Sequence, residues 1–438
     1  MIETILGFYR KSAAVEARDT YDSDVIKEIR RRKWSVFLSI TFGYGFYYVC
    51  RLSFSVAKKP MADAGIFSVS EMGLIGSALF FAYAFGKLAN GIIADRVNVR
   101  KFMATGLMVS AFANLLLGFT EVFWLFLVIW GINGWFQSFG APSSVVSVSH
   151  WFGRKERGSY YGMWSSSHNI GEAITFIGTA FVVSSLGWMW GFRVAGLACL
   201  VMVVVIWKFL HERPEVYGLP GFVHEEPRSI GETQWAVFKN PAVWILALAS
   251  AFFYMTRYAV NSWGIFFLEA EKGYSTIEAS SIVSANAIAG ILGTFFSGIL
   301  SDRIFNGRRN MPALIFGILY AISIALFVLG PASPLMDTLS MVLFGLALGV
   351  LLVYLGGLMA VDICSKAASG TALGVVGVAS YIGAGLQDIL SGYLIEGAKI
   401  TNGEEVIYNF DAAGWMWIGT AVISLVLATL VWNVRSLD

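Results

Sequence analysis

The sequence predicts an all-α membrane protein with twelve transmembrane helices arranged as two bundles of six. Of its 438 residues, 57% are hydrophobic and only 14% are charged, whereas an average soluble domain is about 45–50% apolar and about 25% charged. A helix that crosses the bilayer core needs about 20 apolar residues, and the chain contains twelve such runs. Motifs that recur in the second half of the chain predict the division into two bundles.

The apolar runs are separated by short polar segments whose charges predict the topology. A basic cluster from Arg30 to Lys33 lies directly before the first run and places the N-terminus in the cytoplasm. Basic residues also gather after the second, fourth and eighth runs, so we expect both termini to be cytoplasmic. We expect the first run to end near Ala57 and Lys58 and Lys59 to lie in the external loop that follows it. We expect no signal peptide before the first run, because residues 1–33 are polar and charged. The runs begin near Trp34, Met72, Phe102, Val122, Tyr160, Trp190, Ala242, Ala279, Pro312, Met336, Ala368 and Ala413.

A long polar connection divides the chain into two sets of six spans. It contains Pro214, Pro220 and Pro227 together with several charges, which is typical of a linker between domains. We therefore expect a cytoplasmic N-terminal segment, an N-terminal bundle, a cytoplasmic linker and a C-terminal bundle. Their predicted ranges are residues 1–33, 34–210, 211–240 and 241–438.

Composition also excludes several classes of function. A net charge of +2 argues against nucleic acid as a partner. The three cysteines are far apart in sequence, and with four histidines in the whole chain they form neither a disulfide framework nor a zinc pattern. No nucleophile–base arrangement is visible, so we expect neither an enzyme nor a bound cofactor or metal.

A Gly-x-x-x-Asp-Arg motif occurs once in each half of the chain. Its first copy ends in Asp95 and Arg96, and its second copy ends in Asp302 and Arg303. Two parallel six-helix halves joined by a long loop describe the major facilitator architecture, in which the halves rock around a central site. We expect the motif to act in conformational change, and the alternative is a plain charged turn. Glycines of the fifth run also match those of the eleventh at a constant spacing, with Gly158, Gly162 and Gly171 corresponding to Gly370, Gly374 and Gly383.

Two arginines lie within apolar runs, where a full charge costs roughly 3 to more than 10 kcal/mol. The spacing of Arg51 and Arg257 differs by one residue from that of the two motif copies, so they occupy equivalent places in the two halves. Neither has an acidic residue beside it in its own run, and two facing cations would repel unless an anion bridged them. The planar fork of arginine suits phosphate or carboxylate. The alternative for Arg51 is that its side chain snorkels to the membrane surface.

Other polar side chains fall near these arginines in the predicted helices. Tyr44 and Tyr48 share a helical face with Arg51, and Tyr254 lies three residues before Arg257, although ordinary aromatic packing would also explain them. We expect Lys87 either to line the cavity or to snorkel towards the cytoplasmic surface.

Three further titratable residues lie in the fifth and eleventh runs. His168 could donate to an anion and titrate near neutral pH, or it could simply bond a neighbouring helix. Glu172 lies one turn after it and could pair with it or carry a proton. Asp388 is a second candidate for proton coupling, and its alternative is pairing with a neighbouring polar helix.

Several segments resemble the organophosphate:phosphate antiporters of the major facilitator superfamily. This family includes bacterial glycerol-3-phosphate and hexose-6-phosphate transporters, a hexose-phosphate sensor and the eukaryotic glucose-6-phosphate transporter. The resemblance runs in order through nearly the whole chain. The similar segments are Tyr44 to Arg51, Phe81 to Lys87, Gly134 to Gln137, Lys155 to Gly158, His168 to Gly171, and Tyr254 to Arg257 with Trp263 beyond it.

The resemblance implies roles for individual residues. Arg51 and Arg257 would hold the phosphate group of the substrate, His168 would approach the same site, and Lys87 would assist anion movement. We expect Gln137, Trp164 and Asn169, which lie in or beside the similar segments, to belong to the site as well. The implied activity is the exchange of inorganic phosphate for a phosphorylated sugar, such as glucose 6-phosphate, or for glycerol 3-phosphate.

The chain departs from the family at positions around the expected cavity, and several of these departures change the charge. Glu172 stands where family members usually have glycine, and Leu52 stands where bacterial members have lysine. These changes leave the predicted phosphate grip intact and bear on the rest of the substrate and on the coupling ion. The other departures are at Ser262, Ala287, Leu373, Val376, Gln387 and Asp388.

The sequence therefore predicts a monomeric multi-pass exchanger in the cell membrane that works by alternating access. In this interpretation Arg51 and Arg257 repel each other in the empty cavity, and phosphate relieves the repulsion and draws the halves together. A proton-coupled symporter of organic anions that uses Glu172, His168 or Asp388 is one alternative. A membrane sensor that binds sugar phosphate is another.

Overall fold

The computed structural model describes residues 7–16, 18, 23–221, 231–305, 309–364, 368–402 and 405–432. Nearly all regular structure in these residues is helical. The first half of the molecule contains six spans, two of them built from two consecutive helices. They are α2 (Ser23–Asp63), α3 (Val69–Ala94), α4 (Val99–Leu117), α5 with α6 (Phe123–Gln137 and Gly140–Trp151), α7 with α8 (Arg154–Ser165 and Ser167–Leu186), and α9 (Trp188–Phe209).

The second half repeats this arrangement after a connection that contains η1 (Pro214–Tyr217) and α10 (Gly231–Lys239). Part of the predicted linker, including Pro227, lies outside the described residues. Short η2 (Leu300–Ile304), η3 (Tyr354–Leu358) and α15 (Met359–Asp362) continue two of the spans. Each of the six spans of the second half starts with one of the longer helices. These are α11 (Pro241–Ala270), α12 (Thr276–Ile299), α13 (Asn310–Leu329), α14 (Pro334–Val353), α16 (Ser369–Gly397) and α17 (Asp411–Leu430).

The predicted fold of twelve spans is confirmed. Within the described residues, nine helical segments are long and apolar enough to cross a membrane. The remaining three spans are α2, which also carries charged residues, the 19-residue α4, and the interrupted pair of α5 and α6. Eleven of the spans begin within six residues of their predicted starts.

The first helix differs most from its prediction. It begins at Ser23, about three turns before the expected start at Trp34, and it continues to Asp63 instead of ending near Ala57. Pro60 lies in its last turn, where a proline removes only one backbone hydrogen bond and does not end the helix. Lys58, which the sequence suggested for an external loop, is therefore part of a buried helical surface and is 0% exposed.

Two spans of the first half are interrupted in mid-course. The fourth span breaks at Ser138, between α5 and α6, and the fifth breaks at Ser166, between α7 and α8. In the second half, η3 widens the tenth span, and Gly357 there has φ +150°, which side chains rarely permit. Such local changes in helix winding are frequent at functional sites. The apolar runs in the sequence did not predict them.

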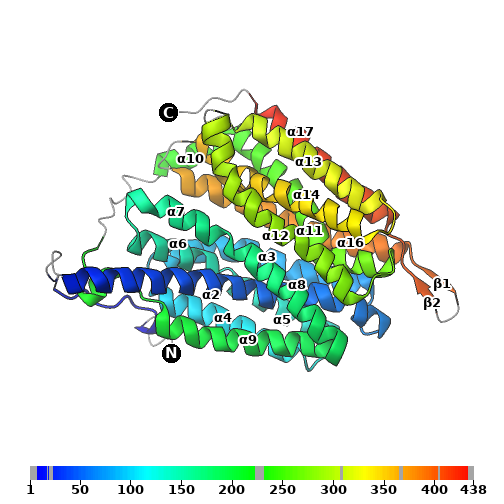
Figure 1. Ribbon diagram of the computed structural model, residues 1–438, viewed down its shortest axis with the longest axis horizontal. Coiled ribbons are helices and arrows are strands. Elements are labelled where there is room, and N and C mark those ends of the chain that lie inside the picture. The colour runs from blue at the N-terminus through cyan, green and yellow to red at the C-terminus, as the bar shows by residue number, and fades with distance from the viewer. Residues whose placement is uncertain are drawn as a thin grey trace.

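The two halves pack against each other mainly through three pairs of helices. Helix α3 lies along α16, α8 lies along α12, and α2 contacts α11. In Figure 1 the ribbons of the two halves converge towards the hairpin β1 (Ile400–Asn402) and β2 (Glu405–Ile407), and they diverge towards α7 and α10. We refer to these as the hairpin end and the linker end of the molecule.

Contacts at the hairpin end bring the halves together at backbone distance. The backbone N–H of Val69 on α3 donates to the Glu396 carboxylate on α16, at 2.9 Å. A Cβ atom built on Gly73 would lie 2.5 Å from the carbonyl oxygen of Asp388, so only glycine permits this approach of α3 to α16. The halves are thus closed against each other at the hairpin end.

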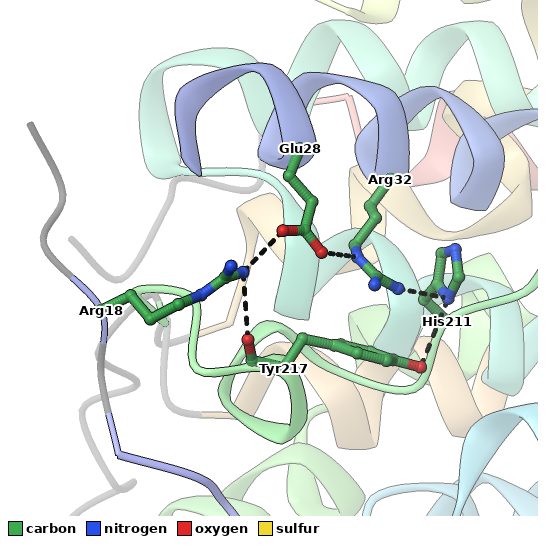
Figure 2. A network of polar contacts seen from close by, with 5 residues as sticks. All are labelled: Arg18, Glu28, Arg32, His211 and Tyr217. Carbon is green, nitrogen blue, oxygen red and sulfur yellow. Dashed lines mark hydrogen bonds and ion pairs between the residues drawn. The ribbon is translucent and has the colours of Figure 1, made fainter. Parts of the chain in front are cut away.

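At the linker end, a polar network attaches the beginning of the linker to the first half (Figure 2). Arg18 donates to Glu28 at 2.6 Å and to the carbonyl oxygen of Tyr217 at 3.3 Å. Arg32 donates to Glu28 at 2.8 Å and to Nδ1 of His211 at 3.1 Å, and its guanidinium covers the Tyr217 ring at 3.8 Å. This network lies outside the predicted first span.

The charges of this network fix the protonation states of two members. Hydrogen bonds from Arg18 and then Arg32 lower the pKa of Glu28 below its ordinary value of 4.5. Burial, and next the positive charge of Arg32, lower the pKa of His211 to about 4. His211 is therefore neutral at pH 7 and accepts the hydrogen bond from Arg32.

Acidification should weaken the attachment of the linker through His211. Because the folded-state pKa of His211 is about 4 and its ordinary value is 6.5, the unfolded chain binds more protons between these values. The stabilisation is fully present above pH 6.5 and falls as the pH is lowered towards 4. We expect the melting temperature of the detergent-solubilised protein to fall between pH 7 and pH 5, and to fall less in His211→Asn. An equal fall in both proteins would contradict this role of His211.

Candidate functional site

Arg51 lies in the middle of α2 in a cage of neutral groups, with its side chain 3% exposed. Its guanidinium lies between the rings of Tyr48 and Tyr83, at 4.6 and 4.4 Å from their centres. It also donates to Oε1 of Gln137 at 3.3 Å and to the Tyr381 hydroxyl at 3.5 Å. Across the described ranges, no carboxylate pairs with Arg51. The cage takes residues from both halves, because Tyr381 belongs to α16.

Arg257 has a different environment, although it occupies the equivalent position in the second half. It lies on α11 and is 2% exposed. Its Nη2 donates to Oε1 of Glu172 at 2.7 Å, and Nδ2 of Asn261 donates to the same oxygen at 3.1 Å. Glu172 belongs to α8, so this ion pair crosses the interface between the halves.

The expectation that both arginines lack a carboxylate is therefore wrong for Arg257. The sequence argument searched only the span that carries each arginine, and Glu172 is 85 residues away in the chain. The predicted pairing of His168 with Glu172 is not formed either. The carboxylate of Glu172 instead bonds the opposite half, because a buried cation there attracts it more strongly than a neutral imidazole.

The break in the fifth span positions His168. The interruption at Ser166 leaves the carbonyl oxygen of Ser165 free, and Nδ1 of His168 lies 2.5 Å from it. A carbonyl only accepts hydrogen bonds, so Nδ1 carries the hydrogen and Nε2 carries the lone pair. Nε2 has no hydrogen-bond partner among the described residues. His168 therefore offers a buried acceptor beside Tyr48, whose ring centre is 5.9 Å away.

Further predicted residues extend the cage along α2 and α7. The ring of Tyr44 lies 5.6 Å from that of Tyr48 and 5.2 Å from that of Trp164. The indole N–H of Trp164 and the side-chain amide of Asn169 have no partner within the part of the chain that the structure describes. Asn169 faces α12, because a Cβ built on Gly290 would lie 3.1 Å from its Oδ1.

Tyr381 connects the surroundings of the two arginines. Its ring lies 4.3 Å from the ring of Tyr83 and 5.4 Å from the ring of Tyr254. Tyr254, as its spacing predicted, lies near Arg257, with the guanidinium 5.7 Å from its ring centre. Lys87 is half-buried and extends towards α16, with Nζ 5.6 Å from the Tyr381 ring centre. This orientation favours the cavity-lining alternative over snorkelling.

Three tyrosines of this site were missed in the sequence, although signals for them exist. Tyr83 lies inside the segment Phe81 to Lys87, one turn before Lys87. Tyr258 directly follows Arg257, and its ring centre lies 5.5 Å from the guanidinium. The repeat that relates the fifth and eleventh spans matches Tyr381 with Asn169. In a chain with 15% aromatic residues, these signals do not stand out.

A second buried ion pair lies closer to the hairpin end. Nζ of Lys58 on α2 is 3.5 Å from Oδ1 of Asp388 on α16, and both side chains are 0% exposed. Lys58 also donates to Ser262 at 3.0 Å and covers the Trp263 ring at 3.5 Å, while Nε1 of Trp263 donates to Asp388 at 2.6 Å. Asp388 thus pairs with a neighbouring helix, which was the alternative to proton coupling.

Arg51 and the Asp388 carboxylate border one buried space. A small cavity is lined by residues that include Arg51, Tyr258, Ser262 and Asp388. Gly76 on α3 makes room for Asp388, because a Cβ atom there would overlap Oδ2 of the carboxylate. Polar groups from both halves therefore border the same buried space.

The Gly-x-x-x-Asp-Arg residues lie apart from this region. Asp95 and Arg96 are exposed at the end of α3, and Asp95 makes no ion pair with any residue that the structure describes. Arg303 is exposed in η2. The side chains of Asp302 and Lys155 lie outside the described part of the structure.

Removing the carboxylate of Asp388 should destabilise the protein strongly. Asp388→Asn would leave Lys58 buried without an anion, which costs about 3–5 kcal/mol. The double variant Lys58→Met/Asp388→Asn carries no buried charge there and should recover most of the loss. Melting temperatures in detergent measure both effects.

Asp63→Asn is a matched control, because Lys59 and Asp63 form an ion pair on the same helix with the Asp63 side chain 55% exposed. Its effect should stay below about 1 kcal/mol. The assignment is contradicted if Asp388→Asn is as stable as the control, or if the double variant is no more stable than Asp388→Asn alone.

Comparison with known proteins agrees with this architecture. Residues 36–388 match the family model described as Major Facilitator Superfamily. The structure of a bacterial homolog to the human lysosomal transporter Spinster, in an inward-facing and occupied conformation, superposes with a TM-score of 0.73 at 17% identity, over 92% of this chain and 97% of that one. At this identity the likeness concerns the fold alone.

Relatives with higher identity cover almost the whole chain. A probable hexose phosphate transport protein of Chlamydia pneumoniae is 33% identical over 95% of both chains. The membrane sensor protein UhpC of Salmonella typhimurium is 32% identical over 82% of this chain and 85% of the sensor. The glycerol-3-phosphate transporter of Bacillus subtilis is 30% identical over 98% of both chains. The chain therefore belongs to the major facilitator superfamily and, within it, to the family of the organophosphate transporters.

Proposed function

We propose that this protein is a secondary active transporter that exchanges an organophosphate for inorganic phosphate by alternating access. The observation that carries the proposal is Arg51, a cation buried between the halves that has no carboxylate partner in the described structure. A charge in this position is functional by default. The relatives named as transporters of hexose phosphate and glycerol 3-phosphate support an organophosphate as its anion.

In this proposal the phosphate group binds first at Arg51 and then engages Arg257. A guanidinium offers two parallel N–H groups to phosphate oxygens. The hydroxyl of Tyr381 can donate to a phosphate oxygen, and Nε2 of His168, which has no partner among the described residues, can accept from a protonated one. Lys87 adds a further positive charge on the same side of α16. Gln137, Tyr44, Tyr48, Tyr254, Trp164 and Asn169 complete the proposed site.

We also propose that the hairpin end faces the exterior and that both termini are cytoplasmic. The basic cluster before the first span and the basic loops that follow even-numbered spans support this orientation. The structure is then a state closed to the exterior, held by the pair of Lys58 with Asp388 and by the contact of Val69 with Glu396. Exchange requires these contacts to separate as the halves, residues 34–210 and 241–438, rock around the site.

One relative is a membrane sensor protein, which supports a second candidate function. The chain is 32% identical to a membrane sensor protein, and a sensor could keep every residue of the site. A sensor would bind the phosphate compound without moving it across the membrane. A proton-coupled symporter differs from both, because a pH gradient alone would drive its net uptake.

Counterflow in proteoliposomes distinguishes these functions. Liposomes with the purified protein are loaded with unlabelled phosphate, and uptake of labelled phosphate is measured with and without the internal load. Internal phosphate accelerates uptake by an exchanger, whereas an imposed pH gradient drives uptake by a symporter. A sensor gives no uptake under either condition. Competition by a panel of sugar and polyol phosphates then identifies the organophosphate. Failure of internal phosphate to accelerate uptake would contradict exchange.

Arg51→Lys should abolish most phosphate binding and exchange. A lysine keeps the charge but lacks the planar fork, and each lost bond to a charged group weakens binding about tenfold or more. Binding of labelled phosphate to detergent-solubilised protein measures the effect. The control is Arg193→Lys, since Arg193 on α9 bonds the carbonyl oxygen of Gly118 away from the site. Equal losses in the two variants would contradict the role of Arg51.

A further inference from the structure

Glu172 places a carboxylate where the proposed mechanism needs a substrate anion. The residue is 1% exposed, and its Oε1 accepts hydrogen bonds from Nη2 of Arg257 and Nδ2 of Asn261. Helix α8 supplies the carboxylate, and α11 supplies both donors. The contact therefore bridges the two halves at one of the two arginines, as a bound phosphate would.

We propose that Glu172 is an internal counter-anion that competes with phosphate for Arg257 and allows the unloaded carrier to change conformation. This inference rests on the proposed transport function. An exchanger cannot return empty if its closed form buries two uncompensated cations. Here Glu172 compensates Arg257, so that of the two arginines only Arg51 is without a carboxylate in the described structure.

The geometry favours this role over a purely stabilising one. A buried ion pair adds little net stability compared with a well-packed apolar pair. This pair also lies across an interface that must rearrange in alternating access, so it forms and breaks in each cycle. The second buried pair, Lys58 with Asp388, lies closer to the hairpin end, and its two opposite charges compensate each other.

The equivalent position in the second half carries no acid. The repeat that matches Gly171 with Gly383 matches Glu172 with Ala384, which is fully buried on α16. Ala384 follows Tyr381, a residue of the Arg51 cage, by about one turn. The molecule thus has an internal anion for one arginine and no acid at the equivalent position for the other.

Two consequences follow for transport. Phosphate must displace Glu172 to reach Arg257, so Glu172 weakens phosphate binding and favours release. The empty carrier can close, so phosphate can also move without a counter-substrate. The protein should therefore carry out net transport in addition to exchange.

The experiment compares efflux of preloaded labelled phosphate from proteoliposomes into medium with and without unlabelled phosphate. For the wild type we expect efflux into phosphate-free medium clearly above that of protein-free liposomes. In Glu172→Gln the ratio of net efflux to exchange should fall about tenfold or more, because the bond lost is one to a charged group. Equilibrium binding of labelled phosphate to the same variant should become about tenfold tighter.

Asp337→Asn is the matched control, because it removes a buried carboxylate that pairs with Lys272 inside the second half, at 2.5 Å. It should leave both the flux ratio and phosphate binding unchanged. Asn261→Ala, which removes the second donor to Glu172, should lower the flux ratio in the same direction and serves if Glu172→Gln does not fold. Elution as a single species from size exclusion monitors folding.

The inference is overturned if the wild type shows no net efflux, or if Glu172→Gln and Asn261→Ala both keep its flux ratio. The binding measurement distinguishes a failure of this inference from a failure of the proposed transport function. If no phosphate moves in either medium, exchange fails, but unchanged phosphate binding in Glu172→Gln overturns the competition independently. Tighter binding without transport would support the internal anion in a sensor.

Discussion

The structure depends on one constraint, which is that a charge buried within the membrane needs an opposite charge or a ligand. At the interface of the halves, each compensated cation takes its carboxylate from the opposite half. Lys58 of the first half pairs with Asp388 of the second, and Arg257 of the second half pairs with Glu172 of the first. Electrostatics and conformation are therefore coupled, because the halves cannot separate without disrupting these pairs. Arg51 is held by neutral tyrosine and glutamine groups instead.

Small residues and polar residues have complementary parts in this interface. Gly73 and Gly76 allow α3 to approach α16 so closely that Asp388 is enclosed between them. Lys58 can then reach the carboxylate only while the hairpin end is closed. The tyrosines around Arg51 provide ring faces and hydroxyl groups that stabilise a cation without neutralising it. A carboxylate in their place would remove the positive charge that an incoming phosphate requires.

Most of the fold followed from the sequence, because apolar runs of membrane length leave few alternatives. The breaks at Ser138 and Ser166 did not, since serine is compatible with a continuous helix and only packing decides otherwise. The individual site residues Arg51, Arg257 and His168 stand out as polar groups in apolar runs. The pairing of Glu172 with Arg257 and of Lys58 with Asp388 could not be predicted, because each pair crosses the interface between residues far apart in the sequence. Lys58 was expected in an external loop because it follows the end of the first apolar run.

The repeat also explains why equivalent arginines behave differently. The two halves share a backbone plan, yet at this equivalent position only α8 has an acid, because Ala384 stands in α16 where Glu172 stands in α8. A symmetric molecule with an acid at both positions would satisfy both arginines and would have no remaining charge for a substrate. A molecule with neither acid would leave two cations facing each other. One acid leaves Arg51 as the unmatched arginine, beside the further positive charge of Lys87. This charge attracts an anion without the repulsion of two facing arginines.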